Sequence, residues 1–535
     1  MDNKNNYRQE EMNMPKFITA QEAAALIPDH ATVGVCGMGL AGWPEEIACA
    51  IRDRFKETGH PCDLDVHQGS AMGDWKTRGI TRLGEAGPGL VTRWSGAHVG
   101  SAFAMRDLAL QNKLQCWCLP QGVIVNLWRE IAAGRPGLIS KVGLGTFVDP
   151  RVQGGKMNEC TTEDRVELIE FQGEEYLFYK GFKCDVALLR GTVADENGNV
   201  TFDHESFITE ALPVATATHN SGGIVIVQVE YLAKKGTFKP KDVKIPGILV
   251  DYVVQATTQD ACWQTEGIYY EPAFSGQIKK PMDSIERMKF DERKIICRRC
   301  AAEVKKGDVI NVGVGIPADM AKVINEENPA YIDQITMSTE SGMVGGVPSA
   351  LPHFGAAYNA EACIDHGYMF DFINGGGLNM TCLGLGEVDV DGNNNTSYLG
   401  KMMTGPGGFI DITRSTPKVL FCGTFMGHAK FKVGDGKLEI VQEGDIRKFV
   451  KKVKQITFAG QYAEKGQTVL YITERAVFQL IDGKVTLIEI APGIDLEKDI
   501  LANMDFKPEI SPDLKTMDPS IFCETWGNLA TTFEK

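Results

Sequence analysis

The strongest constraint on the fold is a local pattern that occurs twice in the chain. Residues 31–39 form an apolar, β-branched run that ends in glycines, and residues 44–51 follow with a proline and helical periodicity. The same order of strand, glycines, proline and helix returns in residues 307–327. A chain that repeats such a unit far along its length is expected to fold as two related halves of strands and helices.

Two further repeats support this interpretation. Residues 184–202 resemble residues 378–398, and residues 222–232 resemble residues 417–425, in the same order along the chain. Strands that alternate with helices predict mostly parallel sheets covered by helices. We therefore predict an α/β protein of two related open α/β domains, with ligands bound at the carboxyl ends of the strands.

The length of 535 residues exceeds one ordinary core and also favours two large domains. We assign residues 1–16 to a polar tail, 17–275 to the N-terminal domain, 276–292 to a linker and 293–535 to the C-terminal domain. Hydrophobic residues make up 43% and charged residues 23% of the chain. This balance is ordinary for a folded globular protein and excludes a largely disordered one.

Charge and composition exclude several classes of function. The net charge of −15 argues against nucleic-acid binding, because phosphate contacts need a basic face. The sequence has no apolar run long enough to cross a bilayer and no apolar segment of a signal peptide near its start, so we expect a cytoplasmic protein. Its 14 cysteines are scattered, which is typical of reduced thiols rather than of a disulfide framework.

The two glycine turns raise a nicotinamide-cofactor alternative. Residues 37–42 match G-x-G-x-x-G and residues 313–318 match its G-x-G-x-x-A form, and Glu340 lies where an acid that binds the ribose is expected. A proline, however, stands where a dinucleotide needs exposed helix N–H groups. An NAD-dependent oxidoreductase therefore remains an alternative, beside glycines that only make tight turns.

Other motifs indicate structural roles. Cys297 and Cys300 have metal-site spacing but no second pair near them in the sequence, so we expect core cysteines and no metal. His353 and His366 flank Glu340 in the sequence, and we interpret both as structural hydrogen-bonding residues. The sequence contains no H-E-x-x-H, G-x-S-x-G or P-loop motif, so metalloprotease, serine hydrolase and P-loop ATPase readings lack support.

Glu340 is placed among glycine-rich backbone. It comes after a predicted strand at residues 334–337, and residues 341–348, 372–380 and 403–412 are dense in glycine. Such segments bring main-chain N–H groups close to a ligand. Aimed at developing negative charge in a dry site, each donor stabilises the transition state by about 3–4 kcal/mol.

These residues resemble the class I coenzyme A transferases, in particular the fused two-domain bacterial acetate and propionate CoA-transferases. The resemblance covers nearly the whole chain. Its landmarks follow in order at residues 119–124, 143–159, 311–317, 339–348, 370–379, 405–413, 472–480 and 489–501.

The resemblance implies that Glu340 is a covalent nucleophile. Its carboxylate would attack an acyl-CoA and CoA would return to form a glutamyl-CoA thioester, from which CoA passes to a second acid in a ping-pong reaction. It implies acetate, propionate, butyrate or acetoacetate as acids, acyl-CoA as a substrate, no tightly bound cofactor, and a dimer or tetramer. An acyl-CoA hydrolase with the same intermediate, or a scaffold protein of this fold, stays open.

The resemblance also assigns the groups around the reacting atoms. A backbone turn on the CoA side, a glycine opposite it and one amide side chain would contact the acyl-CoA. These residues are Gly313, Val314 and Gly315 in the turn, Gly407 or Gly408 opposite, and Gln121 at the acyl group.

Overall fold

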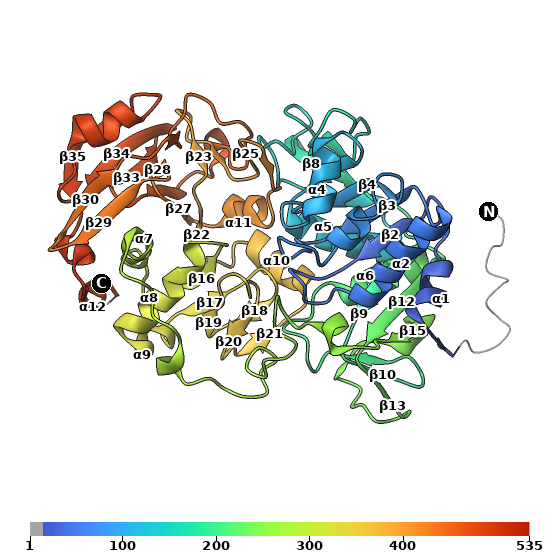
Figure 1. The fold of residues 1–535 in the computed structure, drawn as a ribbon. Helices are drawn as coiled ribbons and strands as arrows, with labels where there is room; N and C mark the ends of the chain where they lie inside the picture. The colour runs from blue at the N-terminus through green and yellow to red at the C-terminus, as the bar shows by residue number, and fades with distance from the viewer. Residues whose placement is uncertain (1–13, 534–535) are drawn as a thin grey trace.

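The computed structural model describes residues 14–533. Figure 1 shows two halves side by side, the first coloured from blue to green and the second from yellow to red. Each half is built around one large sheet. The α/β fold class predicted from the repeats is confirmed.

The sheet of the first half has eight strands in the order β1-β15-β12-β9-β2-β3-β4-β5. Every neighbouring pair in it is parallel. Its strands are β1 (Lys16–Ile18), β2 (Thr32–Val35), β3 (Leu64–Gln68), β4 (Val91–Gly96), β5 (Gln115–Cys118), β9 (Val186–Arg190), β12 (Ile224–Val229) and β15 (Tyr252–Gln255).

The sheet of the second half has ten strands in the order β21-β18-β17-β16-β22-β27-β32-β33-β34-β35. The five from β17 to β32 are parallel, whereas β18, β21 and β33 join antiparallel. The bounds are β16 (Val309–Val312), β17 (Thr336–Ser338), β18 (Met343–Val344), β21 (Ala362–Cys363), β22 (Met380–Gly384), β27 (Lys418–Cys422), β32 (Thr468–Ile472), β33 (Ala476–Ile481), β34 (Lys484–Ile490) and β35 (Glu509–Thr516).

The repeats found in the sequence occupy equivalent places in the two sheets. They fall on β2 and β16, on β9 and β22, and on β12 and β27. In each sheet these three strands are consecutive neighbours, with β3 or β17 on the other side of the first. The two halves therefore share one strand order as well as a similar sequence pattern.

Smaller sheets decorate the two large ones. A three-stranded and a four-stranded sheet lie in the first half, and two-stranded ribbons lie in the second. Their strands are β6 (Gly137–Ser140), β7 (Val166–Phe171), β8 (Glu174–Lys180), β10 (Val193–Asp195), β11 (Val200–Thr201), β13 (Tyr231–Ala233), β14 (Val243–Ile245), β19 (Val347–Pro348), β20 (Ala357–Tyr358), β23 (Glu387–Val388), β24 (Asn394–Asn395), β25 (Tyr398–Leu399), β26 (Met402–Met403), β28 (Met426–Gly427), β29 (Lys430–Gly434), β30 (Lys437–Gln442) and β31 (Ile446–Arg447).

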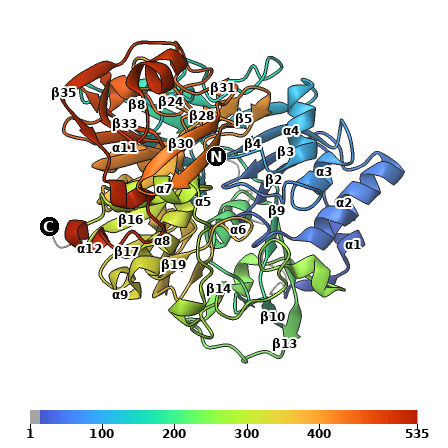
Figure 2. The same cartoon turned by 60° about the vertical axis from the view of Figure 1, so that its left-hand side comes forward.

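Short helices cover the sheets. They are α1 (Ala20–Ala25), α2 (Glu45–Thr58), α3 (Thr81–Gly84), α4 (Phe103–Leu110), α5 (Gln121–Ala132), α6 (Ala211–Asn220), α7 (Glu292–Ala301), α8 (Met320–Glu327), α9 (Pro329–Ile332), α10 (His366–Asn374), α11 (Phe409–Ser415) and α12 (Leu529–Phe533). The view in Figure 2 places α1, α2 and α3 along the outer side of the first half. In the part of the chain that the structure describes, no helix is long and apolar enough to span a membrane.

The helices α5, α10 and α11 join the two halves (Figure 1). The N–H of Gly122 in α5 donates to the Asp411 carboxylate of α11 over 3.0 Å. A Cβ atom at Gly122 would lie 2.4 Å from the Phe370 ring of α10, so glycine is required by the close approach of the helices. Hydrogen bonds and tight packing thus fix one half against the other.

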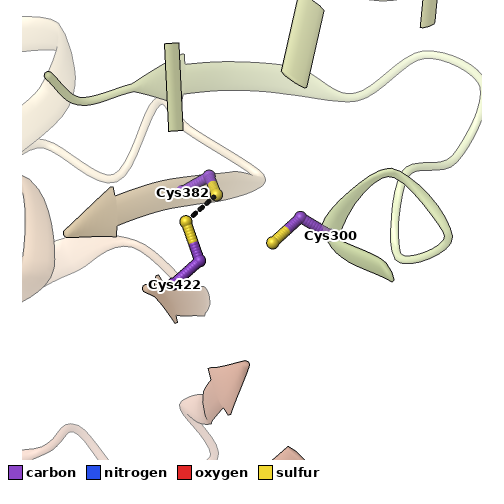
Figure 3. Close-up of side chains that lie close together, drawn as sticks. All are labelled: Cys300, Cys382 and Cys422. Atoms are coloured by element: carbon purple, nitrogen blue, oxygen red, sulfur yellow. Dashed lines mark hydrogen bonds between the residues drawn. The ribbon is translucent and has the colours of Figure 1, made fainter. Parts of the chain in front are cut away.

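Three buried cysteines meet in the core of the second half. Figure 3 shows Cys300 of α7 pointing towards Cys382 of β22 and Cys422 of β27, whose sulfur atoms are 3.5 Å apart. The sequence offered no partners for Cys300, and the fold corrects this by bringing together residues distant in the chain. All three thiols are at most 2% exposed, and such thiols pack as small apolar side chains.

Candidate active site

One cavity of about 270 Å³ lies between the two halves. Residues that follow strands of both large sheets line it, as expected for ligands at strand carboxyl ends. The first half contributes Met38, Gly39, Ser70, Ala71, Gly73, Trp75, His98, Ser101, Gln121 and Glu266, and the second half contributes Gly313, Val314, Glu340, Leu351, Pro352, Phe354, Leu383, Gly384, Thr396, Thr404, Gly405, Pro406, Gly407, Gly408, Phe409 and Ile412.

Glu340 is held in a tight turn after β17. The N–H of Gly342 donates to the carbonyl of Thr339 over 3.1 Å, and the N–H of Thr339 donates to the Met343 carbonyl over 3.0 Å. Gly342 has a φ of 106°, and a Cβ atom there would lie 2.1 Å from the carbonyl oxygen of Ile364. The turn therefore needs glycine directly after Ser341, and it presents Glu340 to the cavity.

The Glu340 carboxylate is buried and incompletely bonded. Its residue is 7% exposed, and Oε2 has no hydrogen-bond partner. Burial raises the pKa of this carboxyl, while the nearby His366 ring and Asn311 amide act to lower it. An oxygen with free electron pairs at a cavity has the electronic form that nucleophilic attack on a bound substrate requires.

The glycine turn after β16 lies at the same cavity. Gly313 and Val314 line it, whereas Gly315 does not. The N–H of Gly313 donates to the carbonyl of Cys382 over 2.8 Å, as part of the backbone bonding beside β22. A donor to a ligand from this turn therefore has to come from Val314 or Gly315.

The opposite wall is formed by the segment before α11. Gly407 and Gly408 both line the cavity. The N–H of Gly407 donates to the carbonyl of Ala97 over 2.9 Å, and its own carbonyl accepts from the N–H of Gln121 over 3.1 Å. Gly408 is then the residue of this pair whose N–H remains for a ligand.

Gln121 belongs to a buried line of three side chains that crosses between the halves. Its Nε2 lies 2.8 Å from Nε2 of His366, and Nδ1 of that ring lies 2.7 Å from Oε2 of Glu210. The three residues are at most 2% exposed. The sequence treated His366 as a structural hydrogen-bonding residue and gave no signal for Glu210, because its partner comes from the other half.

Three titratable groups near the cavity have pKa values shifted from their usual ones. Burial lowers the pKa of His98 to about 4, so its ring is neutral at pH 7. Burial raises the pKa of Asp411 to about 7, against the bond from Gly122. Burial acts to lower the pKa of His366, but the neighbouring carboxylates, Glu210 foremost, outweigh it and raise that pKa above its usual value.

His353 is placed away from this line of side chains. Its Nδ1 lies 2.8 Å from the hydroxyl of Thr265, and burial lowers the pKa of the ring. The residue does not line the cavity, although its neighbours Pro352 and Phe354 do.

The fold and the site together define a two-domain α/β protein with a buried carboxylate at a cavity between its halves. Comparison with known proteins identifies the family. The sequence profile of the coenzyme A transferases matches residues 17–256. A caffeate CoA-transferase of Acetobacterium woodii is 63% identical over 98% of this chain and all of its own length. The chain belongs to the coenzyme A transferase family, and it has the fused two-domain form.

Further relatives agree with this assignment. The acetate CoA-transferase YdiF of Escherichia coli K12 is 43% identical over 95% of both chains. A crystal structure of YdiF from E. coli O157:H7, a thioester complex with CoA, matches with a TM-score of 0.90 and 41% identity, covering 96% of this chain and 98% of that one. The protein is therefore an enzyme that transfers CoA between an acyl-CoA and a carboxylate, and the oxidoreductase alternative is set aside.

Proposed function

We propose that the protein transfers CoA by a ping-pong reaction through a thioester on Glu340. The observation that carries this proposal is the unpartnered Oε2 of Glu340 in the cavity between the halves. The solved YdiF relative described as a thioester complex with CoA supports it.

Each half-reaction has two steps. In the first, a Glu340 oxygen attacks the thioester carbon of the acyl-CoA, a C–O bond forms, the C–S bond breaks and CoA leaves as a thiolate. In the second, the thiolate attacks the glutamyl carbon of the mixed anhydride and the acyl group leaves as a free carboxylate. A second carboxylate then reverses both steps and leaves as the new acyl-CoA.

Backbone donors compensate for a weak nucleophile. Carboxylic acids ordinarily have a pKa of about 4.3 and thiols one of about 8.5, so a carboxylate is a weak nucleophile for displacing a thiolate, and the tetrahedral intermediates need stabilisation. We assign this role to the N–H groups of Val314 or Gly315 on the CoA side and of Gly408 opposite. Gln121 contacts the acyl group. The burial of Glu340 limits water, which would otherwise hydrolyse both intermediates.

The acid substrate is proposed at two levels. The resemblance indicates short-chain acids such as acetate, propionate and butyrate. The relative with 63% identity is named for caffeate, and the cavity of about 270 Å³ is lined by Trp75, Phe354 and Phe409. Aromatic side chains in the wall can pack against an aromatic acid. We propose a hydroxycinnamate-type acid as a second candidate acceptor.

Trapping the intermediate tests the mechanism. The protein is incubated without acceptor with acetyl-, propionyl-, butyryl-, acetoacetyl- or caffeoyl-CoA, and peptides are examined by mass spectrometry for CoA attached to Glu340. We expect the adduct in the wild type and not in Glu340→Gln. Glu266→Gln is the matched control, because Glu266 is a second acid that lines the cavity. Absence of an adduct in the folded wild type with every donor would overturn the proposal.

Acceptor kinetics separate transfer from hydrolysis. Transfer predicts that an added acid speeds acyl-CoA consumption and appears as its own CoA ester, and a panel from acetate to caffeate ranks the candidates by kcat/KM. Steady release of free CoA without any acceptor would instead favour an acyl-CoA hydrolase.

A further inference from the structure

The line of Glu210, His366 and Gln121 ends at the cavity, which Gln121 lines. Nδ1 of the His366 ring bonds to Glu210, and the backbone N–H of His366 donates to the Thr209 carbonyl over 3.2 Å. The backbone of Gln121 is held by the Gly407 carbonyl. The terminal torsion of the Gln121 side chain has two preferred settings half a turn apart.

The protonation of His366 selects between these two settings. With Nδ1–H donated to Glu210, a neutral ring has an acceptor at Nε2, which takes an N–H of Gln121 and leaves the amide oxygen to the cavity. A charged ring has a donor at Nε2, which requires the amide oxygen of Gln121 and turns its NH2 group to the cavity. The structure has the amide nitrogen at this contact, which is the setting of the neutral ring, so the charged ring requires a half-turn of the amide. One setting repels a developing oxyanion and the other stabilises it.

We propose that Glu210 keeps His366 charged in the working enzyme, so that Gln121 presents its amide N–H groups to the acyl oxygen. Glu210 and His366 are then positioning residues, and Gln121 is the group that touches substrate. This inference rests on the proposed function, since it assumes that negative charge develops on the acyl oxygen beside Gln121.

The charges around His366 fit this assignment. Carboxylates reach the ring from three segments: Glu210 before α6, Asp365 before α10 and Glu340 after β17. Of the helices packed against α10, α5 carries Arg129, which pairs with Asp371, and α11 carries Asp411, which accepts from Gly122. Burial opposes the charged ring, but the neighbouring carboxylates outweigh it and raise the pKa of His366.

The pH dependence of kcat tests the inference. The wild type should lose activity as pH rises through the pKa of His366, because the ring becomes neutral and the amide turns. In Glu210→Gln, which keeps a hydrogen-bond acceptor but no charge, this loss should move to lower pH by ~1 unit or more. Gln121→Ala should lower kcat about 10²-fold and abolish the dependence on His366.

The matched control is a partly buried histidine–glutamate pair in the first half. Nδ1 of His204 lies 3.0 Å from Oε2 of Glu230, and neither residue lines the cavity. Glu230→Gln should leave the pH profile of kcat unchanged. Asp411→Asn is a second control. Burial raises the pKa of Asp411 to about 7, so its titration is the other candidate cause of a change in kcat near neutral pH.

The inference would be overturned if the loss of kcat at high pH occurred at the same pH in Glu210→Gln as in the wild type, or if Asp411→Asn abolished that loss. The Glu340–CoA adduct is measured in the same samples. An adduct with an unchanged pH profile rejects the inference alone, whereas no adduct in the wild type rejects the proposed function.

A second measurement uses only the wild type for the titration, so that the inference stays testable if Glu210→Gln fails to fold. The ring carbon of ¹³C-labelled His366, assigned by its loss in His366→Gln, should titrate above pH 6.5, and a ring that is neutral from pH 6 upwards would contradict the inference.

Discussion

The two halves of the molecule place different residues at one equivalent position. When the sequences of the two glycine turns are aligned, Val35 of β2 corresponds to Asn311 of β16. Val35 pairs with Gln68 in β3, and Asn311 pairs with Ser338 in β17. Two residues after each of these partners come Ser70 and Glu340, and both line the cavity. The repeated fold thus brings two strand ends to one cavity, and of these two residues only Glu340 carries a carboxylate.

The surroundings of the two strand ends show how the roles are divided. Next to Ser70, a Cβ atom at Gly69 would lie 2.5 Å from Oε1 of Glu210, so this glycine makes room for the carboxylate that holds His366. In the proposed mechanism the first half supplies Glu210 and Gln121 as support, and the second supplies Glu340 as nucleophile. A duplicated scaffold allows this division, because neither half contains the complete site.

Substitution of each strand-end residue in turn is the strongest test of this comparison, and it has the largest expected effect. Glu340→Gln should lower kcat by about 10⁴-fold or more, since it removes the nucleophile while keeping the side-chain shape. Ser70→Ala should change kcat by less than about 3-fold, because a hydroxyl that is not part of the reaction is lost. CoA-ester formation from a saturating acyl-CoA measures both.

A double exchange adds the control. Glu340→Ser with Ser70→Glu restores one carboxylate to the cavity, yet on the side that lacks Asn311. We expect it to remain as inactive as Glu340→Gln. Recovery of the thioester adduct at residue 70 would show that the two strand ends are chemically interchangeable, and the proposed division of roles would then be wrong.

The joint between the halves should weaken as pH rises, because it buries Asp411. The pKa of this carboxyl is raised from 3.8 to about 7, so the folded protein binds more protons than the unfolded chain between these values. Stability is therefore lost as pH rises through this window, by roughly 4 kcal/mol at 1.36 kcal/mol per pKa unit. Asp411→Asn should raise the unfolding free energy at pH 8 and leave it nearly unchanged near pH 4.

The neighbouring amide permits this substitution. Oδ1 of Asn374 has no partner in the wild type, and its Nδ2 lies 3.4 Å from Asp411. A half-turn of Asn374 would let it accept from the new amide, while Gly122 keeps its acceptor. Urea unfolding at both pH values checks the prediction, and an equal stability change at pH 4 and pH 8 would refute the role of charge.

The sequence predicted what depends on short local patterns. The two glycine turns, the acid at a strand end and the repeated strand order are each carried by contiguous residues, and the fold class follows from them. The antiparallel additions β33 and β18 were not foreseen, because short alternating strands do not show in sequence whether their neighbours run parallel.

The sequence did not reveal which backbone and side-chain groups are left to contact a ligand, because this depends on hydrogen bonds between residues far apart in the chain. The resemblance implied backbone donors in the turn of residues 313–315 and at Gly407 or Gly408. Of these, the N–H groups of Gly313 and Gly407 bond to the carbonyls of Cys382 and Ala97, residues far away in the chain. In the same way, the contact of Glu210 with His366 joins residues 156 positions apart. No motif in one segment reveals such a partner, and the roles of the individual site residues remain predictions.

The two glycine turns allow a smaller comparison. Gly39 and Gly315 have φ angles of 63° and 89°, and an added Cβ would meet nothing within 4 Å at either. Alanine should therefore destabilise the protein by a similar 1–2 kcal/mol at both positions, from backbone strain alone (about 1–2 kcal/mol). Only Gly315→Ala should also lower kcat, by up to ~10²-fold, because it shifts the proposed donor turn. Equal activity of the two variants would dissociate the turn from catalysis.

The smallest expected effect addresses whether the halves unfold together. Each begins with a capped helix: Thr19 accepts from the N–H of Glu22 before α1, and Asp291 accepts from the N–H of Arg293 before α7. Alanine at either cap should cost about 1 kcal/mol.

Because α5 is bonded to α10 and α11 across the joint, we expect one shared transition in urea, which both cap variants shift by similar amounts. Circular dichroism and tryptophan fluorescence, followed in the same samples, would separate two transitions if they exist. If Thr19→Ala moved only one of two transitions, the halves would be independent folding units whose contact is needed for the cavity alone. A single shared shift would mean that the residues joining the halves also stabilise each of them.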